Sequence, residues 1–311
     1  MTNSIPICFY PMRKIVLDDD YAFTQSILLK MHGKNFVSYN SPKEALNYLL
    51  QEYQPLFTKS DLIAKNSSLP DSSTQHIVNV DIEKLKQMLS NFSHQDISVL
   101  CVDYHMPDMQ GIDFLKKIRH LPIKKILITG EKDYRIAIDA FNSGLVDAYL
   151  RKDDPDFSNK IQNNVSELEW KYFIELSSLI LDIPDFNYLK NTYFVAAFKN
   201  FIQENNITAF CLTHIQGSFL TQNMRREQSY VLLSKKAHLQ ELSKIAEEDG
   251  GSQETIEKLK EGKAVLSFGS KDYWEIPANE WDKFLYPATS LLGDPNLVWA
   301  VVTEDHSLQL N

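Results

Sequence analysis

The sequence is poor in cysteine, in uninterrupted apolar stretches and in basic residues. Its 311 residues include three cysteines, at positions 8, 101 and 211. Their odd number and wide spacing argue against a disulfide framework or a zinc cluster and are typical of a reducing compartment, so we expect a cytoplasmic protein. No window approaches the roughly 18 apolar residues of a membrane span, and we expect no signal peptide at the proline-interrupted N-terminus.

Acidic residues outnumber basic ones, and the net charge is -9. This balance argues against a broad electrostatic contact with nucleic acid, which requires Lys and Arg opposite the phosphates. Hydrophobic residues make up 43% and charged residues 23% of the chain, as in ordinary globular proteins. The length is sufficient for two domains, each with its own core.

Three consecutive carboxylates, Asp18, Asp19 and Asp20, directly follow the apolar run Ile15–Leu17. Carboxylates this close repel one another and raise one another's pKa. A divalent cation relieves the repulsion, because hard cations prefer oxygen ligands. The triplet therefore predicts a metal site at the end of a buried strand.

Short apolar runs alternate with amphipathic stretches in the first half of the chain. The pattern predicts strands at 14–17, 35–39, 97–103, 125–129 and 146–150, with helices at 21–31, 42–53, 111–120 and 134–142 between them. Strands that alternate with helices form a doubly wound parallel sheet, an α/β fold. In such sheets the functional residues gather at the carboxyl ends of the strands.

Polar residues follow the predicted strands at those ends. Asp18 and Asp19 follow the first strand, Asp103 ends the third, Thr129 ends the fourth, and Lys152 follows the fifth. Acids, a hydroxyl and an amine are thus expected at one edge of the sheet. This convergence is more specific than any single motif.

The segments IVLDDD, VDYHMPDMQG, LITG and YLRK occur in the order in which they occur in receiver domains of two-component response regulators. Residues 12–155 resemble such a receiver. The resemblance implies a flavodoxin-like fold with five parallel strands. It also implies Mg²⁺ as cofactor, a sensor histidine kinase as partner, and a signalling protein rather than an enzyme.

The resemblance assigns roles to individual residues. Asp103 would be the phosphoacceptor, and the metal ligands would be Asp18, Asp19, Asp103 and the backbone carbonyl of His105. Thr129 would hydrogen-bond the phosphoryl group, and Lys152 would pair with it. Tyr149 would be a switch residue that changes rotamer. Asp108, in the Met-Pro-Asp turn, is an alternative acceptor.

The chain departs from a simple receiver in two places. An insertion at about 54–93 lengthens the segment between the second helix and the third strand, and residues 81–92 within it should be helical. It is interpreted as a packed accessory helix or as a docking surface. Residues 156–182 predict a long linking helix with an apolar stripe from Phe157 to Leu179, which could link phosphorylation to the geometry of a homodimer.

Residues 183–311 predict a smaller α+β output domain. Strands at 207–215, 218–220 and 230–234 with short turns indicate an antiparallel sheet, followed by helices at 236–248 and 253–261. No helix-turn-helix, zinc-ligand set or P-loop is evident, so binding to nucleic acid is not indicated. The domain could bind a ligand, a protein or DNA.

The leading hypothesis is a cytoplasmic response regulator, phosphorylated on Asp103 with Mg²⁺, that switches a non-standard output domain in bacterial signalling such as quorum sensing. Two alternatives remain open. A haloacid-dehalogenase-like phosphatase would use Asp18 as its nucleophile, although the residues after Asp20 fit that family poorly. A non-enzymatic dimerisation or interaction module would need no phosphorylation.

Overall fold

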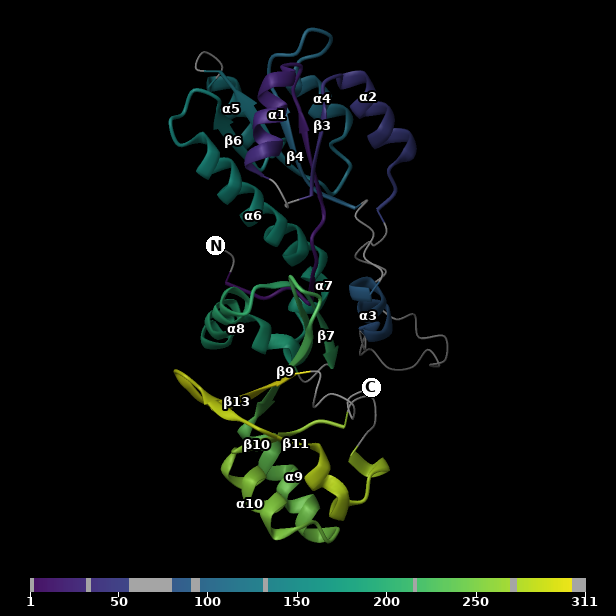
Figure 1. Ribbon diagram of the computed structural model, residues 1–311, viewed down its shortest axis with the longest axis vertical. Coiled ribbons are helices and arrows are strands. Elements are labelled where there is room, and N and C mark those ends of the chain that lie inside the picture. The colour runs from purple at the N-terminus through teal and green to yellow at the C-terminus, as the bar shows by residue number, and fades with distance from the viewer. Residues whose placement is uncertain are drawn as a thin grey trace. The chain divides into compact units, whose positions relative to one another are not determined.

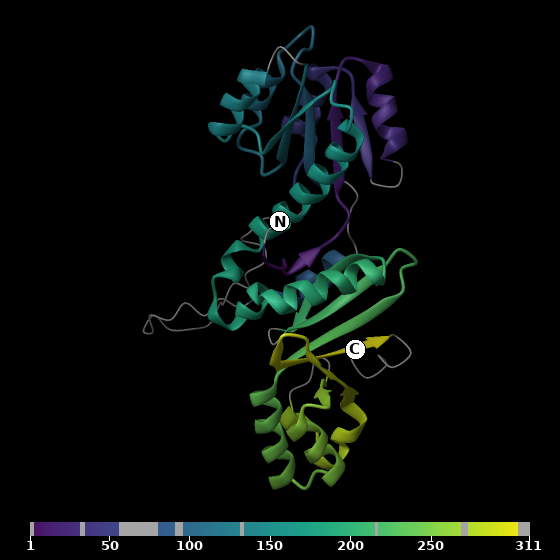
Figure 2. The ribbon, with the colours of Figure 1, turned by 90° about the vertical axis from the view of Figure 1, so that its left-hand side faces the viewer.

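The protein is described by a computed structural model that covers residues 3–31, 35–55, 80–90, 96–130, 134–214, 217–268 and 273–303. The chain divides into two compact units (Figures 1 and 2). As far as they are described, the first unit consists of 11–58 and 92–176, and the second consists of 3–10, 59–91 and 177–311. The chain thus passes from one unit to the other more than once.

A parallel sheet of five strands forms the centre of the first unit, in the order β3-β2-β4-β5-β6. The strands are β2 (Arg13–Leu17), β3 (Phe36–Tyr39), β4 (Ile97–Asp103), β5 (Lys124–Thr129) and β6 (Ala148–Arg151). Every neighbouring pair is parallel. The predicted doubly wound, flavodoxin-like fold is confirmed. Because the strand order reverses at β2, the ends of β2 and β4 lie side by side, where such folds place their sites.

Helices cover both faces of this sheet (Figure 1). They are α1 (Tyr21–Lys30), α2 (Pro42–Asn47), α4 (Gly111–Lys117), α5 (Tyr134–Asn142) and α6 (Phe157–Leu176). Side chains of a strand point alternately to its two faces. Leu100 and Val102 of β4 accordingly lie in a core with Phe114 of α4, while Val99 and Cys101 lie in a second core with residues of α1 and α6.

The start of α2 and the end of α5 follow from their sequences. The Ser41 hydroxyl accepts a hydrogen bond from the Glu44 N–H at the start of α2, and Pro42 occupies the first helical position, which needs no N–H donor. The helix predicted as far as residue 53 changes after Asn47 into a π-helical turn, Tyr48–Glu52. Gly144 follows α5 with a φ of 66°, a left-handed conformation that favours glycine.

The long helix predicted for 156–182 is interrupted. Helix α6 ends at Leu176, and a separate short helix, α7, spans Ser178–Leu181. Ser177 lies between them with its side chain fully buried, and its hydroxyl accepts a hydrogen bond from the Ile7 N–H at 3.1 Å. Leu179, which the predicted stripe counted as apolar contact surface, is 48% exposed.

An antiparallel sheet of six strands forms the second unit, in the order β1-β7-β8-β9-β13-β12. Its strands are β1 (Cys8–Phe9), β7 (Ile207–His214), β8 (Ser218–Asn223), β9 (Gln228–Lys235), β12 (Thr289–Leu291) and β13 (Asp294–Thr303). The antiparallel meander β7–β9 agrees with the expected α+β pattern. The edge strand β1 comes from the start of the chain. It runs antiparallel to β7, with Cys8 opposite Cys211 in the strand register.

Both faces of this sheet are covered. On one face, α8 (Thr192–Glu204) follows a 3-10 helix at Pro184–Lys190, and its Phe194 and Phe198 pack against Phe210 and Phe219 of the sheet. The other face carries α9 (Lys236–Glu248), α10 (Gln253–Glu261), the pair β10 (Ala264–Leu266) and β11 (Leu285–Pro287), and the short 3-10 helices Tyr273–Glu275 and Ala278–Phe284. Figure 2 shows α8 along the sheet.

The insertion contributes a helix to the second unit. Helix α3 spans Ile82–Ser90 and contacts β7, and its Leu85 and Leu89 are buried. Apart from residues 54, 55, 80 and 81, the rest of the inserted segment lies outside the described residues. Across those residues, no helix combines the length and apolar character needed to cross a membrane.

Candidate phosphoacceptor site

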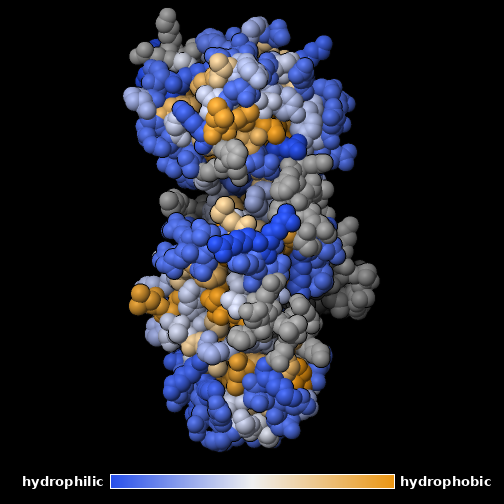
Figure 3. Space-filling view, viewed as in Figure 1, coloured by the Kyte–Doolittle hydropathy of each residue, from blue (hydrophilic) through white to orange (hydrophobic). Residues whose placement is uncertain are grey.

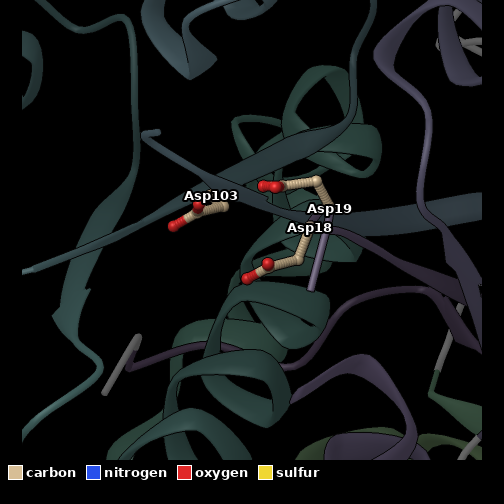
Figure 4. A group of neighbouring side chains, drawn as sticks. All are labelled: Asp18, Asp19 and Asp103. Carbon is tan, nitrogen blue, oxygen red and sulfur yellow. The ribbon is translucent and has the colours of Figure 1, made fainter. Parts of the chain in front are cut away.

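Three carboxylates meet at the carboxyl end of the parallel sheet. Asp18 and Asp19 follow β2, and Asp103 is the last residue of β4. Since β2 and β4 are neighbours, one oxygen from each of the three side chains lies within 4.8 Å of the others (Figure 4). The sequence prediction that strand ends would bring these acids together agrees with this geometry.

Lys152, just after β6, supplies the positive charge of the cluster. Its Nζ lies 2.7 Å from Asp18 Oδ2 and 2.9 Å from Asp103 Oδ1. Its backbone N–H donates to the carbonyl of Thr129 at 2.9 Å, which fixes it to the end of β5. The ammonium also lies 4.6 Å from the centre of the Phe23 ring, a distance at which a cation and an aromatic face attract.

Burial and mutual repulsion shift the acids of the site. Asp18 is fully buried and Asp103 nearly so, and burial raises the pKa of both carboxyls. Lys152 opposes the rise in both pKa values. The charge of Asp19 adds to the rise for Asp18, and the charges of Asp18 and Asp19 add to it for Asp103. For Lys152, burial lowers the pKa, but the two carboxylates outweigh burial and raise it overall.

Asp20 plays a different part from the other two members of the acidic triplet. Its side chain accepts a hydrogen bond from the Phe23 N–H at 3.1 Å and so caps the first turn of α1. Its backbone N–H donates to Asp18 Oδ1 at 3.0 Å. The expectation that the whole triplet is a metal site is therefore too broad, because the third carboxylate is committed to the helix.

Asn40, which follows β3, supports the site and was missed by the sequence analysis. Its Nδ2 donates to the carbonyl oxygen of Asp18 at 2.7 Å and to Thr24 Oγ1 at 3.2 Å. The Thr24 hydroxyl in turn donates to the carbonyl of Tyr21 in α1. The sequence did contain a signal for this role, because Asn40 is a polar residue directly after another predicted parallel strand.

Gly111, at the start of α4, was also missed. A Cβ atom at this position would lie 2.2 Å from the carbonyl oxygen of Asp103, closer than real atoms approach. Its N–H donates to the carbonyl of Tyr104 at 2.8 Å. Only glycine allows α4 to begin this close to the backbone that carries Asp103.

The remaining candidate residues lie around this centre. Thr129 is fully buried at the end of β5, where its hydroxyl donates to the carbonyl of Gly130 at 2.9 Å. Tyr149 in β6 is half-buried, with its ring centre 6.3 Å from that of Phe141. His105 and Asp108 are both exposed in the loop after β4, and neither belongs to the carboxylate cluster of the described residues.

The donor set fits a hard divalent cation. All three groups offer carboxylate oxygens, the ligands that Mg²⁺ takes. One ammonium offsets only one of the three charges. Within the described part of the chain, the Lys152 ammonium is the one cation beside the buried Asp18 Oδ2. Receiver domains generally bind Mg²⁺ in such an acidic pocket.

Comparison with known proteins agrees with this geometry. The profile of the response regulator receiver domain matches residues 61–156, which include Asp103, Thr129 and Lys152. Together, the fold and the two matches support a two-component response regulator with a receiver domain in its first half. Receiver domains act in signalling and interact with sensor histidine kinases.

A solved structure resembles the chain over nearly all of the given sequence. The response regulator LqsR of Legionella pneumophila is 28% identical, with a TM-score of 0.79 over 97% of this chain and 90% of that chain. Its similarity therefore extends through the second unit. No curated protein matches the chain.

Other solved structures cover about half of the chain. A receiver domain protein of Clostridium thermocellum is 20% identical, with a TM-score of 0.33 over 51% of this chain and 94% of that chain. A CheY-like receiver domain protein of Methanospirillum hungatei is also 20% identical, with a TM-score of 0.33 over 51% of this chain and 98% of that chain.

Proposed function

We propose that a sensor histidine kinase phosphorylates Asp103 and that the phosphoryl group switches the protein between two states. The observation that carries the proposal is the position of the Asp103 carboxylate, 2.9 Å from the Lys152 ammonium and beside two further acids. The Asp103 side chain is 6% exposed, while that of Asp18 is 0% exposed. Asp103 is therefore the more accessible nucleophile of the two.

The transfer follows from the groups present. An oxygen of Asp103 attacks the phosphorus of the kinase phosphohistidine, a phosphorus–oxygen bond forms, and the phosphorus–nitrogen bond breaks. The bonding electrons remain on the imidazole nitrogen, which takes a proton from solvent. Lys152 pairs with the resulting acyl phosphate. Asp18, Asp19, Asp103 and the His105 carbonyl would hold Mg²⁺, whose chemistry is to neutralise charge on the transferring group.

The new phosphoryl group adds charge next to the end of β5. Thr129 would exchange its hydrogen bond to Gly130 for one to a phosphoryl oxygen, which would draw the loop inward. Tyr149 would then change rotamer beside Phe141. On α5, Ile136 is 40% exposed and Phe141 48% exposed, which supports a change in this surface and a homodimer that forms upon phosphorylation.

The proposal also covers the cellular compartment, the signalling process and the role of the second unit. Cys8, Cys101 and Cys211 are buried free thiols, in keeping with a protein of the reducing cytoplasm. The similarity to LqsR supports a role in bacterial signalling such as quorum sensing. The second unit would be a non-standard output domain. On the face drawn in Figure 3, the surface is mostly hydrophilic, with smaller hydrophobic areas.

The direct test is phosphoryl incorporation from acetyl phosphate with Mg²⁺, followed by mass spectrometry of the intact chain. We expect labelling of the natural protein and of Asp108→Asn, and no labelling of Asp103→Asn. Full labelling of Asp103→Asn together with none of Asp108→Asn would make Asp108 the acceptor. Gel filtration of labelled and unlabelled protein tests dimerisation.

The same preparation distinguishes the two alternatives. Turnover of a generic phosphate ester that is lost in Asp18→Asn would indicate a phosphatase of the haloacid-dehalogenase type. The full burial of Asp18 argues against this outcome, because a nucleophile must reach its ester. A stable dimer whose mass and partner binding do not respond to phosphorylation would indicate an interaction module instead.

A further inference from the structure

The second unit contains a cavity of about 200 Å³ on one face of its antiparallel sheet. Tyr230, Leu232 and Ser234 of β9 line it from the sheet. Helix α3 covers this region at β7, while α9 and β10 cover it at β9. The cavity thus lies between α3 on one side and α9 with β10 on the other. All its lining residues belong to the second unit.

The polar lining of the cavity is basic and hydroxylic. Lys86 of α3, His214 of β7 and His238 of α9 all contribute to it, and none of the described lining residues is acidic. Glu83 lies 3.3 Å from Lys86 and Glu241 lies 3.7 Å from His238, and neither acid belongs to the lining. The side chains of both acids are at least 73% exposed, so water weakens their effect.

Two hydroxyls increase the capacity of the cavity to bind an anion. The side chains of Ser218 and Ser267 line it, and among the described residues the structure gives neither hydroxyl a hydrogen-bond partner. Hydroxyls donate to carboxylate or phosphate oxygens, and such bonds to charged groups are about twice as strong as neutral ones.

The apolar lining favours a flat ring. Phe268, Tyr230 and Trp274 contribute aromatic rings, and Leu242 and Val265 contribute aliphatic side chains. An apolar cavity of about 150 Å³ holds benzene. A volume of about 200 Å³ therefore fits a single ring with one small substituent.

From this combination we propose that the cavity binds a small aromatic anion, a single ring that carries one carboxylate or phosphonate-like group. The ring lies among Tyr230, Phe268 and Trp274, and the anionic group faces Lys86, His238 and the serine hydroxyls. The site is independent of Asp103, because every lining residue belongs to the second unit. Lys86 would report the ligand to α3, within the segment that separates α2 from β4.

The test uses the full chain with benzoate and with phenylphosphonate, neither of which can transfer a phosphoryl group. Trp274 is 68% exposed at the cavity, so a bound ring should change tryptophan fluorescence in a saturable way. Benzylamine and benzyl alcohol are the cationic and neutral controls. We expect each anion to bind at least about tenfold more tightly than either control, as expected for one charge-assisted contact.

Matched variants locate the binding. Lys86→Met and His238→Gln should each weaken binding of the anions about fivefold or more and leave benzyl alcohol unchanged. Lys84→Met, on the same helix but outside the lining, should have no effect. Trp274→Phe should retain binding, measured by calorimetry, but lose most of the fluorescence change.

A measurement on the unaltered protein guards against variants that fail to fold. Methyl NMR signals of Leu232 and Val265 should shift with benzoate, while those of Ile161 and Val165 in the first unit should not. The proposal is overturned by absence of saturable binding up to about 10 mM of both anions, by equal affinity for benzyl alcohol, or by shifts confined to the first unit.

Discussion

The Glu169 carboxylate of α6 lies 2.5 Å from the Lys14 ammonium of β2, with both side chains at least 91% buried. The same oxygen accepts hydrogen bonds from the Met12 N–H and the Ser98 hydroxyl, each at 3.2 Å. This buried cluster joins α6 to the amino ends of β2 and β4. It lies at the opposite end of these strands from Asp103.

Removal of this charge should destabilise the first unit strongly. Glu169→Gln keeps an acceptor for Met12 and Ser98 but leaves the buried Lys14 without its counter-charge, so we expect a loss of about 3–5 kcal/mol. Glu175→Gln is the matched control. Glu175 pairs with Lys124 but is 48% exposed, and Asp147 remains as a partner of Lys124, so the expected loss is about 1 kcal/mol or less.

Amide hydrogen exchange in β4 and β5 measures both variants, because it reports the stability of the first unit separately. Equal protection in the two variants would contradict the importance given to the buried pair. Simultaneous replacement of Lys14 by Met and Glu169 by Leu should restore most of the loss.

Gly111→Ala should disturb the backbone at Asp103. The added methyl group would lie 2.2 Å from the Asp103 carbonyl oxygen, so α4 must shift. We expect a loss of about 1–3 kcal/mol in hydrogen-exchange stability, together with slower labelling by acetyl phosphate. Gly144→Asn is the control, since Gly144 has open space and asparagine tolerates its φ of 66°. Unchanged labelling in Gly111→Ala would remove the positioning role of this glycine.

The acidic triplet should separate into metal ligands and a helix cap. Asp19→Asn should weaken Mg²⁺ binding about tenfold or more, because it removes a charged oxygen ligand. Asp20→Asn should leave Mg²⁺ affinity nearly unchanged, since asparagine still caps α1, while Asp20→Ala should cost about 1 kcal/mol of stability. Calorimetric titration with Mg²⁺ measures the affinities. An equal loss of Mg²⁺ affinity in Asp19→Asn and Asp20→Asn would show that Asp20 is also a metal ligand.

The pH dependence of stability follows from the raised pKa of Asp103. Burial raises this pKa above its ordinary value of 3.8, so the folded state binds the proton more readily than the unfolded state. The stabilisation that comes from this tighter proton binding is therefore fully present below pH 3.8. It is lost as the pH rises through the raised pKa of Asp103 in the folded state.

Asp103→Asn should consequently stabilise the first unit at pH 7, by more than the roughly 0.5 kcal/mol typical of surface substitutions, and the gain should shrink toward pH 4. Lys152 keeps Asp18 as a partner in this variant. Hydrogen exchange at several pH values provides the measurement, with exposed Asp108→Asn as control. A gain that is independent of pH would show that ionisation of Asp103 is not its cause.

The parallel sheet was predictable because its strands are continuous apolar runs that end in polar residues. Ile97–Asp103 is fully buried along its length, and the predicted bounds agree with β4. The carboxylates of Asp18 and Asp103 follow from the same argument, since parallel strands end at one edge. Tertiary contacts of single residues were not predictable in this way: the Asn40 hydrogen bonds and the proximity of Gly111 to Asp103 depend on how loops fold back.

The break at Ser177 shows why a periodic pattern was insufficient. The apolar spacing continues through Leu179, but the buried Ser177 hydroxyl is used by the Ile7 N–H, 170 residues away in the sequence. Strand β1 could not be predicted from the sequence either, because its two residues, Cys8 and Phe9, are too few to give a periodic signal. Both features depend on the N-terminal segment, whose apolar residues lacked an identifiable partner in the sequence alone.

The pairing of β1 with β7 has a genetic consequence. A gene fragment for residues 183–311 would encode neither Cys8–Phe9, which completes the edge of the antiparallel sheet, nor α3, which contacts β7. The second unit is therefore assembled from three stretches of coding sequence. Transfer of the second unit to another receiver would require the start of the chain and the insertion as well. A simple end-to-end gene fusion therefore cannot transfer the complete unit.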